Sequence, residues 1–143
     1  MGARFMVSNA EQILTEMERL LANALRTSLH LNYNDLQPAR IVQQIADDLA
    51  KNSFIWLGNT TYVPNRVIIF LPEQNNEKLE ELHVLFNSPA FISLLDRYIS
   101  ERGFELFDTL RFEIEAIDGE HIQDESLKIS FRWITLEEYE SAT

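Results

Sequence analysis

The residue types that most often carry chemistry are few in this chain, and their spacing matches no known reaction. The histidines His30, His83 and His121 have no second histidine or carboxylate at a metal-ligand spacing on an expected helix or strand. His121 lies among Glu120, Asp124 and Glu125, in the loop 118–125, where a divalent cation could bind weakly. Acidic loops are ordinarily just solvated, so we expect no metal site.

Other catalytic patterns are absent from the sequence. Without cysteine, the chain has no disulfide, no thiolate ligand and no cysteine nucleophile. Its four glycines form neither a Walker A run nor a GxGxxG fingerprint, and no GxSxG elbow occurs. Glu113 and Glu115 are spaced for one solvated strand face rather than for general acid–base work. The residues predict no enzyme and no cofactor; the alternative is a hydrolase whose site is assembled from distant residues.

Composition narrows the classes of partner. The 143 residues suit one domain, and the formal net charge is −11. The 12 basic residues are scattered along the chain, which disfavours binding to nucleic acid or to an anionic membrane surface. A basic protein surface would be attracted; the alternative is that the charge serves solubility alone. The longest mostly apolar run, Val67–Leu71, is far below the roughly 20 residues that span a bilayer.

Helices are expected at four places. A capping box at Ser8–Glu11 starts the first, and Pro38 suits the first turn of the second, which should end near Lys51. Helical spacing of leucines indicates a third over Asn76–Phe86. Ser88-Pro89 starts the fourth, and Gly103 ends it.

Strands are expected between and after these helices. An aromatic strand, 54–57, leads through a Gly58-Asn59 turn into a longer strand, 61–71. Pro64 interrupts that strand and cannot donate to a ladder, which predicts an edge position or a bulge there. Period-two alternation indicates two further strands, each with one buried face, at 110–116 and 127–133.

The order ααββααββ predicts a two-layer α+β domain over residues 1–136, with a polar tail at 137–143. We expect an antiparallel or mixed four-stranded sheet with helices on one face. A KH-like core is compatible with this order, and a KH-like module for single-stranded nucleic acid is the alternative function. The joint Leu85–Ala90, where KH domains carry their GXXG loop, has neither glycine nor a basic residue, which argues against that binding.

Aromatic side chains are the first candidates for contact with a partner protein. Trp56, Tyr62, Trp133 and Tyr139 could each anchor a partner, because aromatic residues are enriched at interface hot spots. We expect Trp56 and Trp133 to belong to the core instead. Tyr139, in the polar tail, is the better candidate for exposure.

The interruption at Pro64 supplies a second candidate. Asn65 and Arg66 follow it, at a point where a peptide could extend an exposed sheet edge. The alternative is that Pro64 protects this edge from aggregation. The predicted partner-contacting residues are therefore Asn65, Arg66 and Tyr139.

Three motifs resemble a known family. Leu36-Gln37-Pro38 with Ile41, then Thr61–Asn65 ending in Val-Pro-Asn, then Val67–Pro72 are similar to the N-terminal domain of FhaA-type forkhead-associated proteins. The Gly103-Phe104 segment and the strand that contains Phe112 are also similar. The resemblance covers about residues 20–117.

The resemblance implies more than the residues alone do. It implies a module followed by a long flexible linker and a phosphothreonine-reading forkhead-associated domain, so that a chain ending at Thr143 looks like an excised fragment. Such proteins are adaptors in bacterial Ser/Thr-kinase signalling, tied to cell-envelope synthesis and division. The implied partners are proteins, a Ser/Thr kinase or envelope proteins, and the implied location is the cytoplasm, with recruitment by partners to the inner face of the membrane.

Overall fold

The first two helices lie where local signals predict them. This computed structural model describes residues 9–27, 37–71, 76–106, 108–116 and 128–134. Helix α1 spans Asn9–Thr27, and the capping residue Ser8 lies outside the described residues. Helix α2 spans Pro38–Lys51, with its proline in the first turn, where a missing N–H removes no helical hydrogen bond.

The next two helices form a pair joined by two residues. Helix α3 spans Asn76–Phe86 and helix α4 spans Pro89–Glu101. The side chain of Ser88 caps α4 by accepting a hydrogen bond from the Phe91 N–H at 3.3 Å. Gly103 follows α4 with a φ of 77°, the left-handed conformation that stops a helix. The four expected helices are confirmed.

A small mixed sheet, sheet A, holds strands β1, Phe54–Ile55, β2, Thr61–Val63, and β4, Phe104–Leu106, in the order β1-β2-β4. Strand β2 pairs antiparallel with β1 and parallel with β4. A 3₁₀ turn, η2, over Leu57–Asn59 joins β1 to β2, with φ values of 74° at Gly58 and 63° at Asn59. The expected turn with positive φ at glycine is therefore present.

The second mixed sheet, sheet B, has the order β5-β3-β6. Its central strand β3, Arg66–Leu71, is parallel to β5, Arg111–Ala116, and antiparallel to β6, Lys128–Arg132. Strands β3 and β5 are parallel because α3 and α4 form the crossover between them.

The expectation of one four-stranded sheet is wrong, because the expected long strand 61–71 divides at Pro64. Strand β2 ends at Val63 and β3 begins at Arg66, and each is the central strand of its own sheet. The edge position expected for Pro64 is therefore also wrong. Its missing N–H falls between the two sheets, where no ladder hydrogen bond is needed.

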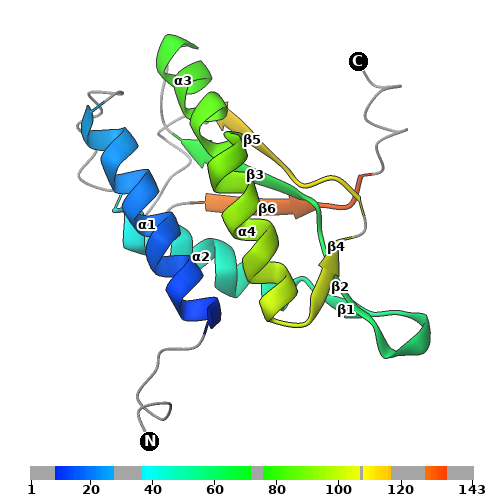
Figure 1. Cartoon of the computed structure of the whole chain (residues 1–143). Coiled ribbons are helices and arrows are strands. Elements are labelled where there is room, and N and C mark those ends of the chain that lie inside the picture. Colours follow the sequence, from blue (N-terminus) through cyan, green and yellow to red (C-terminus); the bar gives the residue numbers. More distant parts are fainter. Residues whose placement is uncertain (1–8, 28–36, 72–75, 107, 117–127, 135–143) are drawn as a thin grey trace, which may run out of the picture.

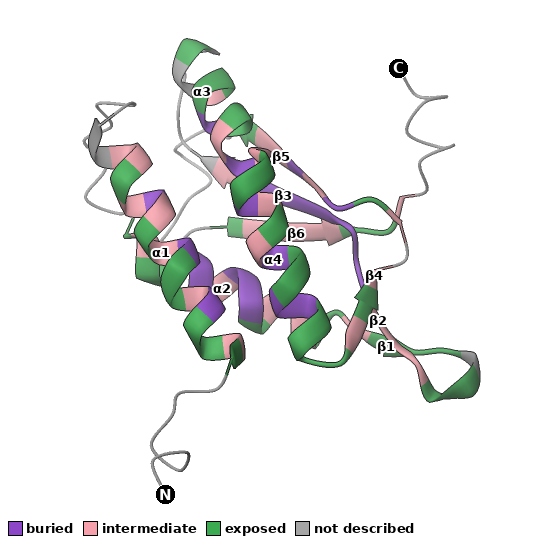
Figure 2. Cartoon of the chain, in the orientation of Figure 1, coloured by how far each residue is buried: buried purple, intermediate pink, exposed green. Residues whose placement is uncertain are grey.

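The core lies between the helices and the two sheets. Figure 1 shows α1 and α4 side by side over the strands, while the β1–β2 hairpin extends away from the helices. In Figure 2 the buried residues gather on the inner faces of the helices and along β3. At the centre, the rings of Phe86, Phe91 and Phe112 lie 5.3–5.6 Å apart, centroid to centroid. None of the described helices is long and apolar enough to cross a membrane.

Candidate functional site

Asn65, the first residue predicted to contact a partner, is buried and fully engaged within the chain. Its side chain is 1% exposed. Its Nδ2 donates to the carbonyl oxygens of Thr109 and Ile134, and its Oδ1 accepts from the Ile134 N–H at 3.0 Å. Its own carbonyl accepts from the Arg111 N–H at 2.9 Å. Asn65 thus joins the start of β3 to the start of β5 and to the chain beyond β6.

Arg66 is also inside, at 3% exposure. Its Nη1 donates to Glu113 Oε1 on the neighbouring strand β5, at 3.1 Å. Because β3 is flanked on both sides, no peptide can extend it as an edge strand. Contact between a partner and Asn65 or Arg66 stays a prediction that this geometry disfavours. Tyr139 lies outside the described residues.

The two tryptophans are exposed, so the expectation that they belong to the core is wrong. Trp56 is 54% exposed and Trp133 is 36% exposed. Strand β6 ends at Arg132, so Trp133 lies beyond the alternation that would have turned it inward. Trp56 lies beyond the two residues of β1, in the hairpin that projects past the helices (Figure 1).

Sheet register gathers other residues beside these tryptophans. Phe54 pairs with Tyr62 across β1 and β2, and Tyr62 pairs with Glu105 across β2 and β4. Directly paired residues point to the same face of a sheet, so these three side chains form one row. Val63, the next residue of β2, points to the other face and is fully buried in the core.

The row and the tryptophans line a cavity of about 550 Å³, which we call the aromatic groove. Its lining residues are Phe54, Trp56, Tyr62, Glu105, Leu106 and Trp133. The ring of Phe54 lies 5.1 Å from that of Trp56, at an interplanar angle of 61°, and 5.1 Å from that of Trp133, at 75°. The rings therefore meet edge to face.

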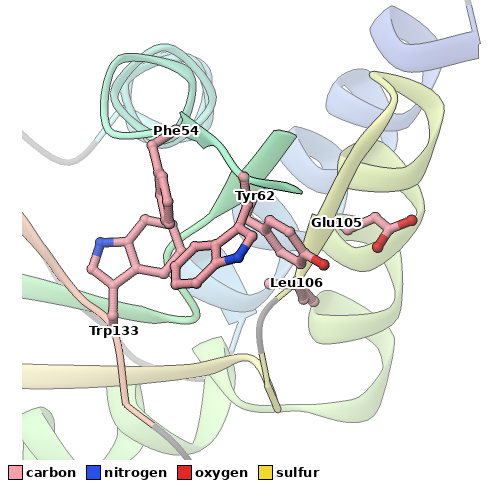
Figure 3. Close-up of a pocket in the computed structure, with 6 residues that line it drawn as sticks. Phe54, Tyr62, Glu105, Leu106 and Trp133 are labelled. Atoms are coloured by element: carbon pink, nitrogen blue, oxygen red, sulfur yellow. The ribbon is translucent and has the colours of Figure 1, made fainter. Parts of the chain in front are cut away.

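Figure 3 shows how the groove is laid out. Phe54 and Trp133 approach each other at one end, Tyr62 lies in the middle, and the Glu105 carboxylate lies at the other end. The groove is thus a run of aromatic rings that finishes in a negative charge. Its volume falls in the range of about 300–1,000 Å³ that is typical of ligand-binding clefts.

Groups that could hold a metal ion do not gather in the described part of the chain. No cluster of three or more His, Asp or Glu side chains occurs among the residues described. His83 is exposed on α3, while His30, His121 and the acidic loop around His121 lie outside the described residues. The side chains that line the aromatic groove present aromatic faces and one carboxylate, that of Glu105.

The aromatic groove was not predicted from the sequence, although the spacing of two of its aromatic residues pointed to it. Phe54 and Trp56 are two residues apart, which places both on one face of a strand. The whole segment 54–57 is apolar, so its pattern alone does not separate a buried strand from an exposed aromatic face. Glu105 gave no signal, because only the register of β2 and β4 brings it beside Tyr62.

Comparison with known proteins assigns the chain to a family. The family model for the FhaA N-terminal domain matches residues 14–129. The chain belongs to this family. The resemblance inferred from the three motifs is thereby confirmed. Five of the six residues that line the groove lie within the matched span, and Trp133 lies beyond it.

The fold of this FhaA N-terminal domain is shared with a solved structure, Rv0020c_Nter. The two are 20% identical with a TM-score of 0.53, over 77% of this chain and 76% of the other. At that identity the likeness concerns the fold alone. No curated protein matches the chain.

Proposed function

We propose that this FhaA N-terminal domain is a non-catalytic protein-interaction module that docks a partner in its aromatic groove. The observation that carries the proposal is the exposure of Phe54, Trp56 and Trp133, at 40%, 54% and 36%, around one groove in which Phe54 contacts both tryptophans edge to face. Clustered exposed aromatic rings are costly to hydrate and are enriched at the hot spots of interfaces. Covering them with a partner would recover that free energy.

The family supports the cellular setting of the proposal. By resemblance to that family, we propose that the module belongs to a forkhead-associated adaptor that acts in bacterial Ser/Thr-kinase signalling, linked to cell-envelope synthesis or division. The partner is a protein of that pathway, a kinase or an envelope-synthesis protein, met in the cytoplasm. Reading the coding sequence that follows Thr143 tests the adaptor architecture: a forkhead-associated domain is expected there.

The KH-like alternative receives one supporting feature and one opposing feature. Strand β3, helices α3 and α4 and strand β5 follow one another as in a KH core, with β3 parallel to β5, except that β4 of sheet A lies between α4 and β5. The joint between α3 and α4 consists of Asn87 and Ser88, and both side chains act within the chain. Asn87 exchanges two hydrogen bonds of 2.9 Å with the backbone of Phe112, and Ser88 caps α4. No GXXG loop is available to clamp a nucleic-acid backbone, so we do not propose this function.

Affinity capture with matched variants tests the docking function. The 143-residue chain, a Trp56→Ala variant and an Ile55→Ala variant are each immobilised, and the bound proteins are identified by mass spectrometry. Ile55 is the matched control, because it is adjacent and 67% exposed but pairs with Thr61 on the opposite sheet face. A partner that docks in the groove should bind the parent chain and the Ile55 variant and be lost from the Trp56 variant. Identical sets of bound proteins for all three chains would contradict the proposal.

A further inference from the structure

We infer that the occupant of the aromatic groove is a proline-rich segment of a partner protein that carries a basic residue at one end. This inference rests on the proposed docking function and adds the chemistry of the partner. Three features of the groove support it: the arrangement of its rings, the kind of hydrogen-bonding groups it presents, and its charge.

The rings suit the shape of a polyproline II helix. Phe54 meets Trp56 at 61° and Trp133 at 75°, so the rings stand as ridges with slots between them rather than as one flat stack. A polyproline II helix has three residues per turn and presents compact pyrrolidine rings at regular intervals. Aromatic-lined grooves dock such segments, and the preformed helix loses little entropy on binding.

The hydrogen-bonding groups of the groove also match a proline backbone. Among the described residues, neither the Trp56 indole N–H nor the Tyr62 hydroxyl has a hydrogen-bond partner. Both groups can donate. Proline has a backbone carbonyl that accepts but no N–H that needs an acceptor, and a polyproline II helix leaves its carbonyls unpaired. A segment rich in other residues would bring many N–H groups, for which the side chains of the groove offer few acceptors: the Glu105 carboxylate and the Tyr62 hydroxyl oxygen.

That carboxylate fixes the charge of the occupant. Glu105 is exposed at the end of the groove away from Trp133, and no basic residue of the described part of the chain lines the groove (Figure 3). A Lys or Arg at one end of the segment would pair with Glu105 while the prolines lie on the rings. The formal net charge of −11 would attract such a segment at long range, and would repel an acidic one.

Titration with three synthetic peptides tests the inference. Each is about ten residues long, enough for three turns of polyproline II helix. The first is proline-rich with one terminal arginine, the second is the same peptide with glutamate in place of arginine, and the third is a Gly/Ser peptide with the same arginine. The two tryptophans of the chain both line the groove, so their fluorescence reports its occupation directly.

The arginine–proline peptide should bind saturably and shift the tryptophan emission to shorter wavelength. By calorimetry, Trp56→Ala should weaken its binding about 30-fold, as loss of a hot-spot side chain does, while Ile55→Ala should leave it unchanged. Glu105→Gln should weaken it about threefold, the effect of an exposed ion pair, and should reduce the difference between the arginine and glutamate peptides.

Two outcomes would overturn the inference. Equal binding of the Gly/Ser peptide would show that the charge alone is recognised. Absence of binding by both proline-rich peptides, while Trp56→Ala still abolishes capture of a partner, would refute the proline chemistry and leave the docking function standing. If Trp56→Ala changes neither capture nor peptide binding, the docking function itself fails.

Discussion

At the scale of single residues, the side-chain amides of two asparagines make hydrogen bonds of the kind that a neighbouring backbone strand would make. Asn65 exchanges hydrogen bonds with the N–H and C=O of Ile134, and Asn87 does the same with Phe112. A primary amide has the donor and the acceptor of a peptide group on one side chain, so it can continue a ladder where no strand is present. Asn65 does so where the two sheets meet, which explains why it is buried beside Pro64.

Replacing Asn65 therefore tests folding rather than binding. Asn65→Ala should lower the free energy of unfolding by about 2 kcal/mol, because it leaves the backbone groups of Thr109 and Ile134 without their partners. Asn65→Asp should cost more, since a carboxylate cannot donate to the two carbonyls. Urea denaturation measures both. Asn52→Ala is the control: its side chain makes one exposed hydrogen bond, to the Asp48 carbonyl, and should cost under about 1 kcal/mol.

At the scale of elements, local signals predicted the helices and could not predict which strands pair. Pro38, Ser88 and Gly103 act on their own neighbours, so the sequence around each was sufficient to place a helix boundary. Strand pairing joins residues far apart, and alternation is the same in one sheet as in two. The interruption at Pro64 was predicted, but for that reason its division of the strand between two sheets was not, and the three-residue strand β4 was missed. The aromatic groove depends on the same pairing and was missed with it.

The β1–β2 hairpin depends on one glycine for its turn. Gly58 has a φ of 74°, and a Cβ there would meet nothing within 4 Å, so Gly58→Ala should cost about 1 kcal/mol through backbone strain alone. The Trp56 N–H donates to the Thr60 carbonyl across this turn at 2.8 Å. Hydrogen exchange of the Trp56 amide should accelerate about fivefold in the Gly58→Ala variant. A loss of about 1 kcal/mol changes the equilibrium constant for opening of the hairpin by that factor.

Gly103→Ala is the matched control for the hairpin. Its φ is 77° and its Cβ would also meet nothing within 4 Å, but it lies between α4 and β4. It should lower the global free energy of unfolding by about 1 kcal/mol and leave the exchange of the Trp56 amide unchanged if the hairpin opens on its own. Equal acceleration of that amide in both variants would show that the hairpin opens only with the whole domain.

At the scale of the whole molecule, the rings that stabilise the fold are separate from the rings that form the groove. Phe91 is fully buried and contacts Phe86 and Phe112, so Phe91→Ala should cost about 3–5 kcal/mol of a total near 5–15 kcal/mol. Trp56→Ala removes an exposed ring and one edge-to-face contact and should cost about 1 kcal/mol. Thermal unfolding, monitored by circular dichroism, measures the loss of stability in both variants. A loss of stability in the Trp56 variant as large as that in the Phe91 variant would show that the groove rings stabilise the fold as core residues do.

The net charge of −11 should lower the stability of the whole folded domain. With 23 acidic and 12 basic side chains, the folded state brings like charges closer together than the unfolded chain does, and their repulsion opposes folding. Raising NaCl from about 0.01 to about 0.1 M shortens the Debye length from about 30 to about 10 Å, which screens that repulsion. The melting temperature at pH 7 should therefore rise by about 3 °C, as a gain of under 1 kcal/mol would produce.

The pH dependence of this salt effect separates self-repulsion from other causes. Near the isoelectric point of about 4.6 the net charge approaches zero, so the same addition of NaCl should leave the melting temperature unchanged there. Screening of favourable surface ion pairs, such as Lys51 with Asp48, acts in the opposite direction and would lower the melting temperature. A rise at pH 7 that vanishes near pH 4.6 identifies the acidic surface as the cause. A fall at pH 7 would mean that ion pairs outweigh it, and that the acidic surface costs this domain little stability.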